Sequence, residues 1–299
     1  MKIIRNLINC DAILTSDWHM MEQSKNPVCR LDNHFEAQSN KIKQINKLQK
    51  KYKCPIFFAG DLFEHWKVSP ELINHCLKIF PDKIWGIPGQ HDLPQHNINL
   101  INKSAFQTMI YGGKIKFLSK LGWWGFNSDE VEYFKFKNKL VIILHLLVYK
   151  DKEPFPGSNA PSVDKIFKMF PKADLILTGD NHMTFSAVSY RNGKKQILIN
   201  PGSLTRHKAD QINHKPSVFL WDSQNNSCFR YYLSVNDSVI IRDHLDYIKQ
   251  KEEIQNKFIN SLKMQWTTGL SFFDNIQKGI YKNPLSNSVK KYVLRWCRH

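Results

Sequence analysis

The chain has 299 residues, a formal net charge of +17 and a sequence pI of about 9.5. Hydrophobic residues make up 42 % and aromatic residues 12 % of it, which excludes a mainly disordered chain and allows a sizeable packed core. The excess of positive charge attracts polyanions, of which nucleic acid is the commonest in cells; a lysine-rich protein without such a partner is the alternative.

Short runs dense in Ile, Leu, Val and Phe predict strands that are buried on both faces. Between them, residues 33–52 have apolar side chains at helical spacing, and Ser69-Pro70-Glu71 has the capping hydroxyl, first-turn proline and acid of a helix start. Aromatic segments at 114–126 and 217–233 predict further strands. This order predicts a layered α/β fold, with β-sheets flanked by helices. The expected buried strands are 12–15, 55–58, 83–87, 140–144, 175–178 and 197–199.

The residue composition and hydrophobic pattern of the sequence change near residue 235. This change predicts a first domain at 1–235 and a mainly helical, basic C-terminal region at 236–299. Residues 240–266 have the pattern of a charge-mixed helix, which either packs on its own domain or docks a partner. From 275 onwards cations alternate with aromatic residues and no acid occurs, a mixture suited to phosphates and bases, or else to a solvated basic tail. These residues are Lys278, Tyr281, Lys282, Lys290, Lys291, Tyr292, Arg295, Trp296 and Arg298.

The spacing of the cysteines and the length of the apolar runs indicate the cellular compartment in which the protein is expected. The six cysteines are scattered and form no C-x-x-C pair, which argues for a reducing environment and against a disulfide framework or zinc knuckle. The apolar run near the start is too short for a signal peptide, and the stretch at 140–148 is far below the roughly 20 residues that span a bilayer. We therefore expect a soluble, cytoplasmic protein with no membrane partner.

Five of the expected strands end in polar clusters. In an open α/β sheet, ligands bind at the carboxyl ends of the strands, so these clusters are expected to converge. Taken singly, each is uninformative, because Gly-Asp is often a turn and a histidine in an apolar strand is often a core residue. Five in succession favour a site, and Gly60, Gly89 and Gly179 are expected to supply its sharp turns. The clusters hold Asp17 and His19, then Asp61 and Glu64, then Gln90, His91 and Asp92, then His145, then Asp180 and His182.

Carboxylate and imidazole donors without cysteine suit manganese, iron or zinc. Two such ions about 3.5–4 Å apart would activate a water molecule and stabilise in-line displacement at phosphorus. Such a set of residues would therefore be able to promote displacement at phosphorus.

The clusters resemble the signature of the calcineurin-like metallophosphoesterases, which is D-x-H, G-D-x-x-D/E, G-N-H-D/E, a lone His and G-H-x-H. The resemblance covers roughly residues 10–205. The sequences at residues 86–92 and 200–203 look most like those of the SbcD-type DNA repair nucleases and their bacteriophage relatives. By that resemblance, the chain is a DNA exonuclease or endonuclease; an ATPase partner of the SbcC type and a homodimer are candidate assemblies.

The resemblance implies a role for each matching position. Two divalent ions are implied, with manganese expected and magnesium, iron or zinc as alternatives. His91 would contact the phosphate or protonate the leaving oxygen, and Asp92 would orient His91. The implied metal ligands are Asp17, His19 and His182 for the first ion, Asp61 as the bridge, and Gln90, His145 and Asp180 for the second.

Two positions depart from the family pattern. Gln90 stands where the family usually has Asn, and Asp180 stands where it usually has His, which makes the second position richer in hard oxygen donors. The departures leave open a weakly bound second ion, and also a non-catalytic DNA-binding or scaffold protein with a decayed metal site. A phosphatase or small-molecule phosphoesterase on the same fold is a further alternative. Glu64 is expected to support the fold, and His96 and His207 are the remaining histidines nearest to motif loops.

Overall fold

The computed structural model describes residues 9–154, 157–191, 193–241, 253–254, 256–257, 272–282 and 286–296. The chain divides into two compact units, Met1–Ile241 and Arg242–His299. The division falls shortly after the boundary that the sequence suggests near 235. Residues just before it belong to the first unit, because Ile240 forms a bridge with Arg30 and the Ile241 amide donates to the Cys29 carbonyl. The helix expected at 240–266 therefore does not include its first two residues, and most of its remainder lies outside the described residues.

The first unit contains two β-sheets. The first has the strand order β11-β10-β1-β2-β3-β4, and the second has the order β5-β6-β7-β9-β8. β1 to β4 run parallel to one another, as do β6, β7 and β9. The strands of the first sheet are β1 (Ala12–Thr15), β2 (Ile56–Ala59), β3 (Ile84–Ile87), β4 (Ile115–Phe117), β10 (Ser217–Asp222) and β11 (Ser227–Tyr232). Those of the second are β5 (Phe134–Phe136), β6 (Lys139–His145), β7 (Leu175–Gly179), β8 (Phe185–Arg191) and β9 (Lys194–Asn200).

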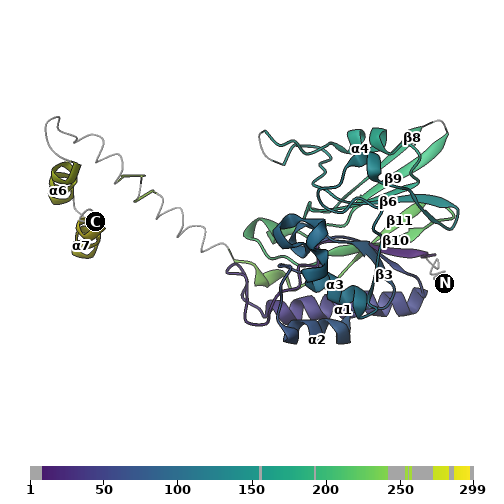
Figure 1. Ribbon diagram of the computed structural model, residues 1–299, viewed down its shortest axis with the longest axis horizontal. Helices are drawn as coiled ribbons and strands as arrows, with labels where there is room; N and C mark the ends of the chain where they lie inside the picture. The colour runs from purple at the N-terminus through teal and green to yellow at the C-terminus, as the bar shows by residue number, and fades with distance from the viewer. Residues whose placement is uncertain are drawn as a thin grey trace, which may run out of the picture. The chain divides into compact units, whose positions relative to one another are not determined.

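Helices cover the outer faces of both sheets, so the unit has four layers (Figure 1). Successive side chains of a strand point to opposite faces of the sheet, so neighbouring residues belong to different layers of the core. Ile13 faces the helices, whereas the adjacent Leu14 faces the second sheet. The helices of this unit are α1 (His34–Tyr52), α2 (Pro70–Ile79), α3 (Ala105–Tyr111) and α4 (Val163–Met169). Short 3-10 helices are η1 (Gln90–Asp92), η2 (Pro94–His96), η3 (Ile98–Lys103), η4 (Ser128–Glu130), η5 (Ala209–Asn213) and η6 (Asp237–Val239).

The layered α/β fold predicted from the sequence is confirmed. Each expected buried strand is present, and α2 begins as expected, with the Ser69 hydroxyl accepting from the Leu72 amide and Pro70 in the first turn. Two strands were not predicted: β5 is only three residues long, and β8 alternates between half-buried and exposed positions at a sheet edge. Neither strand carries the continuous apolar run on which the prediction depended.

The second unit contains the helices α6 (Phe272–Lys282) and α7 (Asn287–Trp296). In α6, Ile276 and Ile280 are buried on one face while Lys278 and Lys282 are exposed, which is the pattern of an amphipathic helix. The basic segment that the sequence singles out is thus helical where it is described, and its nucleic-acid role stays a prediction. Among the residues that the structure describes, no helix is long and apolar enough to cross a membrane.

Trp18 anchors the turn that presents two of the candidate metal ligands. Its side chain is fully buried, and its ring packs edge-on against Phe58 and Phe80 at 5.2 Å between centroids in each case. The indole N–H donates to the Thr15 hydroxyl at 2.9 Å. Because Trp18 lies between Asp17 and His19 in the chain, its burial turns both neighbours away from the core and towards the site.

We expect Trp18→Ala to lower the free energy of unfolding by about 3–5 kcal/mol, because it deletes a large buried ring and leaves a cavity. Thermal or denaturant unfolding measures this loss. Trp18→Phe keeps most of the ring contacts and should lose less. If Trp18→Ala unfolds like the unmodified chain, the anchoring role is wrong.

Candidate metal centre

The five polar clusters converge at one edge of the two sheets. Contacts across the sheets hold them there: the Asp17 amide donates to the Gly60 carbonyl at 3.0 Å, and the Asp180 amide donates to the Asp17 carboxylate at 3.0 Å. The His145 ring lies 2.6 Å from the Ala59 carbonyl, which links the end of β6 to the end of β2. The convergence expected from the strand ends is therefore present.

Four of the candidate ligands have left-handed backbone conformations. The φ angles are 50° at Asp17, 45° at His19, 56° at Asp61 and 74° at Asp180. Non-glycine residues rarely adopt such angles, and strain of this kind concentrates at functional sites. The chain therefore keeps a side chain at each of these positions despite a backbone conformation that favours glycine.

The motif glycines lie in close contact with neighbouring atoms of the site. Gly60 has the positive φ of a sharp turn, 89°, as expected, but among the motif glycines Gly89 and Gly179 do not. A Cβ on Gly89 would lie 2.1 Å from the Asp61 carboxylate, and one on Gly179 would lie 2.2 Å from the Ala59 carbonyl. The expectation that all three serve as turns is thus wrong for two of them, where close approach excludes a side chain.

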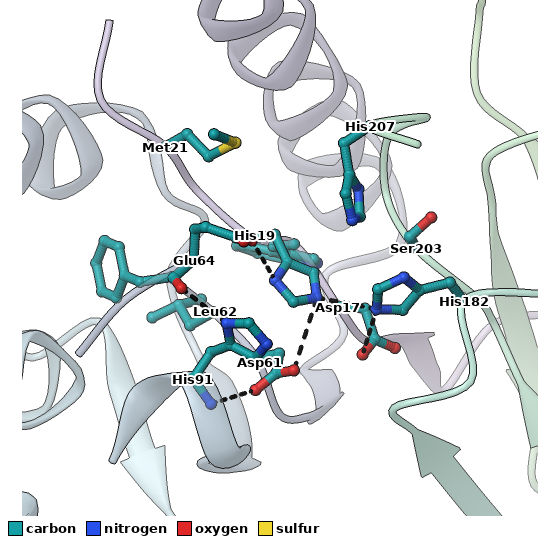
Figure 2. A network of polar contacts seen from close by, with 12 residues as sticks. Asp17, His19, Met21, Asp61, Leu62, Glu64, His91, His182, Ser203 and His207 are labelled. Carbon is teal, nitrogen blue, oxygen red and sulfur yellow. Dashed lines mark hydrogen bonds and ion pairs between the residues drawn. The ribbon is translucent and has the colours of Figure 1, made fainter. Parts of the chain in front are cut away.

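His19 is the centre of the first group of donors (Figure 2). Its Nε2 atom lies 3.1 Å from Nε2 of His182, and the His182 Nε2 lies 4.0 Å from the Asp17 carboxylate. One donor atom from each of these three residues falls within 4.8 Å of the others. The structure therefore brings together the three ligands expected for the first ion.

Asp61 lies between the first and second groups. Its Oδ2 atom is 3.6 Å from Nε2 of His19 and 3.3 Å from Nε2 of His145. Its other oxygen accepts from the His91 amide at 3.0 Å, which fixes the carboxylate plane. One oxygen facing both groups is the arrangement that a bridging carboxylate needs.

Buried atoms without partners show that the donor set fits a metal centre. Within the part of the chain that the structure describes, the buried side-chain atoms without a hydrogen-bond partner include Oδ2 of Asp17, Oδ2 of Asp61, Oε1 of Gln90 and Nε2 of His145. Such atoms are costly to bury, and native structures normally pair them. Because Nδ1 of His145 lies against the Ala59 carbonyl, Nε2 is the ring atom that faces the cluster and would bind an ion. The residues therefore fit the divalent ions that the sequence predicts.

The buried charged groups of the cluster shift one another's pKa values. Burial raises the pKa of Asp61, but the facing His145 and His19 outweigh burial and hold that pKa well below its usual range. Burial lowers the pKa of His145, yet Asp61 reverses this and raises it to about 10. Burial and the nearby His19 lower the pKa of His182 to about 2. The buried carboxylates thus favour positive charge on the facing histidines, and bound divalent ions would take over that role.

The two residues that depart from the family pattern contact each other. The Gln90 amide nitrogen donates to the Asp180 carboxylate at 2.8 Å, and the Gln90 carbonyl oxygen has no hydrogen-bond partner in the described parts of the chain. The longer side chain at 90 and the shorter one at 180 therefore meet across the space where the second ion is expected. Asp180 is half-buried, and its carboxylate belongs to none of the tight donor groups found among the described residues.

Asp92 does not have the role that the sequence suggests. Its carboxylate accepts from the amides of Leu62, Phe63 and Gly89 at 3.0–3.1 Å, so it ties the loop after β2 to the loop after β3. The His91 ring is held instead by the Glu64 carbonyl, 2.7 Å from Nδ1. The expected orientation of His91 by Asp92 is corrected accordingly, because the buried amides use the Asp92 oxygens.

Glu64 has a larger role than the fold support expected of it. Its carboxylate lies 2.8 Å from Nδ1 of His19, so it fixes that ring with Nε2 directed at the site.

His207 is a second addition to the residues expected at the site. Its ring centroid is 5.2 Å from that of His19 and 5.0 Å from that of His182. Only its position after a motif loop hinted at this; His96, by contrast, is exposed beside Trp124.

A cavity of about 730 Å³ opens beside the cluster. Gln90, His91, Asp180 and His182 contribute to its wall. The rest of the lining includes the cationic and aromatic residues Tyr149, Lys150, Lys152, Phe185 and Lys208, together with Asp151 and several uncharged residues. The candidate ligands of both ions are thus accessible to a substrate of considerable size.

A two-sheet α/β sandwich with a buried Asp/His cluster at its strand ends defines a metal-dependent phosphoester hydrolase. The chain belongs to the calcineurin-like phosphoesterase family, whose sequence model matches residues 12–184, more than half of its length. No curated protein sequence matches it significantly.

Several solved structures are similar to the chain. A single mutant of Vps29 from Entamoeba histolytica is 16 % identical, with 76 % of this chain and 94 % of that chain covered and a TM-score of 0.37. Wild-type Vps29 complexed with Zn²⁺ from the same organism is 17 % identical, with 76 % and 94 % covered and a TM-score of 0.36. A metallophosphoesterase from Sphaerobacter thermophilus is 12 % identical, with 75 % and 89 % covered and a TM-score of 0.37.

Removing the charge of Asp61 should uncouple the two metal positions. Asp61→Asn keeps the shape of the side chain, so the fold should survive, while bound metal should fall from two ions towards one or none. Hydrolysis should then drop below detection, because the bridging carboxylate is a ligand of both ions and neither has a substitute for it. Metal analysis and a phosphodiesterase assay on one preparation test this. Two retained ions with near-normal turnover would show that Asp61 is not a bridge.

Asp92→Ala should lower stability rather than activity alone. It leaves the buried amides of two loops without an acceptor, and each unsatisfied amide costs about 1–3 kcal/mol. Thermal unfolding measures the effect. His91→Ala, which removes a single ring contact with the Glu64 carbonyl, is the matched variant and should lose less stability. A stable Asp92→Ala protein that has only lost turnover would restore the orienting role.

Proposed function

We propose that this protein is a metal-dependent nuclease that hydrolyses phosphodiester bonds in DNA, as its resemblance to the SbcD-type nucleases implies. The observation that carries the proposal is the basic cavity beside the candidate metal ligands. Lys150, Lys152 and Lys208 are exposed on its wall, with Asp151 as the acid between them. Lysines at such positions neutralise backbone phosphates, and this agrees with the net charge of +17.

The cavity also offers surfaces for bases. Tyr149 and Phe185 are half-buried in its wall, beside the lysines. Aromatic rings next to cations bind single-stranded nucleic acid without regard to sequence, because every base has a face that can stack. A substrate that crosses this wall would bring a phosphate to His91 and His182. An unpaired strand or strand end is therefore the form of DNA that the cavity suits best.

The residues of the chain divide the chemistry among them. Asp17, His19, His182, Asp61, Gln90, His145 and Asp180 would hold the two divalent ions. When bound, such ions activate the attacking water and stabilise the charge that develops on phosphorus. His91 stands outside this set, with Nδ1 directed at the Glu64 carbonyl, so its Nε2 is the atom available to the substrate. We infer that it donates a proton to the leaving oxygen or to the phosphate.

The choice of ion follows from the donor types. Carboxylate and carboxamide oxygens at Gln90 and Asp180 favour a hard ion at the second position, so manganese or magnesium suits it better than zinc. A phosphatase or small-molecule phosphoesterase remains the alternative function on this fold, and a wide basic cavity favours it less. An ATPase partner of the SbcC type and a homodimer are proposals that follow from the resemblance alone.

Digestion of end-labelled DNA tests the proposed function. We expect cleavage with manganese, none in excess chelator, and a lower rate when a blocked end denies access to an exonuclease. Cleavage in excess chelator, or hydrolysis of a chromogenic phosphodiester with no cleavage of any DNA, would contradict the proposal.

Replacing Lys150, Lys152 and Lys208 together by Gln should raise KM for DNA and leave hydrolysis of a small phosphodiester unchanged. It should also reduce the slope of log affinity against log salt by about 2, since each lost phosphate contact contributes roughly 0.7–0.9. The matched control replaces Lys43, Lys47 and Lys50, which are exposed on α1. Equal effects of the two triple variants would show that the cavity does not bind the DNA.

A further inference from the structure

His207 lies at the candidate metal centre, although no motif of the family includes it. In Figure 2, His207 and His91 lie on either side of His19, and both rings are directed towards it. The ring centroids are 4.9 Å apart for His19 and His91, and 5.2 Å apart for His19 and His207. Two imidazoles therefore lie beside the candidate ligands, and the proposed function uses only that of His91.

The loop that carries His207 is fixed to the site at several points. Gly202 has a φ of 74° and packs so closely that a Cβ there would lie 2.7 Å from the His182 carbonyl. The Leu204 amide donates to the Asp17 carbonyl at 3.0 Å, and the Thr205 hydroxyl lies 3.0 Å from Nε2 of His34. These contacts join the loop to the turns that hold two candidate ligands, so its position depends directly on theirs.

The backbone of His207 is fully paired, but its ring is not. Its amide donates to the Gln211 side chain at 2.8 Å, and its carbonyl accepts from the Cys29 thiol at 3.3 Å. Nδ1 of the ring is buried and has no hydrogen-bond partner among the residues that the structure describes. His214, a structural histidine of the same region, instead places Nε2 2.8 Å from the Ser203 carbonyl. The ring of His207 thus lacks a structural contact of that kind.

The distances also separate His207 from the metal ligands. Donor atoms of Asp17, His19 and His182 converge within 4.8 Å of one another, whereas His207 belongs to no such group among the described residues. It is therefore adjacent to the ligands without being one of them. A group in that position would lie near a phosphate held by ions at these ligands.

We propose that His207 is a further catalytic residue, which donates a hydrogen bond to a non-bridging oxygen of the scissile phosphate on the side of His19 away from His91. An imidazole N–H is a suitable donor, and a hydrogen bond to a charged oxygen is stronger than one between neutral groups. The inference rests on the phosphodiester chemistry of the proposed function, but not on DNA as the substrate.

The test compares His207→Ala and His207→Gln with the unmodified protein, all loaded with manganese. Calorimetry measures the binding of inorganic phosphate, and a chromogenic phosphodiester gives kcat and KM. His207→Ala should bind phosphate about tenfold to hundredfold more weakly and lose a similar factor in kcat/KM, the usual range for a hydrogen bond to a charged group. Metal content should stay unchanged. His207→Gln, whose amide can also donate, should recover part of the loss.

His75→Ala is the matched control, because His75 is a half-buried histidine on α2 whose ring contacts Ser39. It should leave phosphate binding and turnover unchanged. Unaltered phosphate affinity in both His207 variants would overturn the proposal, and so would a loss of bound metal that accounts for the weaker binding. Should His207→Ala fail to fold, His207→Gln and His207→Asn decide by the same measurements. DNA that resists the unmodified protein would contradict the nuclease function and leave this result intact.

Discussion

The carboxylate of Asp61 is the group on which the rest of the site depends. It is fully buried between His19 and His145, and such a charge is stable in a protein interior only when positive charge faces it. The surrounding architecture meets this requirement. Gly89 leaves space against the carboxylate, the His91 amide donates to it, and the ends of β2 and β6 are held together by the contact of His145 with Ala59.

The same requirement explains why so much of the centre is strained or lacks partners. Left-handed backbone at candidate ligands, buried atoms without hydrogen bonds and closely packed glycines are each unfavourable in a fold that serves only its own stability. The extensive core compensates, since the two sheets pack face to face and helices cover both outer faces. The rigid layers thus hold side chains in an arrangement that is useful only when cations occupy it.

The contact between Gln90 and Asp180 shows how the two departures from the family pattern are related. Lengthening the side chain at one position and shortening it at the other keeps the two groups within hydrogen-bonding distance. Both still offer oxygen, so the change alters the hardness of the donor set rather than removing it. The second position thus differs in donor type from the histidine-rich first one.

The sequence by itself determined the family, the order of the buried strands and the residues that meet at their ends, because apolar runs and the polar clusters that follow them are local patterns. It did not determine the roles of Asp92, Glu64 and His207. Those depend on which loop amides, carbonyls and rings approach one another across the two sheets. Likewise, close packing around His145 explains Gly89 and Gly179, whereas the sequence suggested only turns. Such contacts join residues far apart in the chain, and only the tertiary structure decides them.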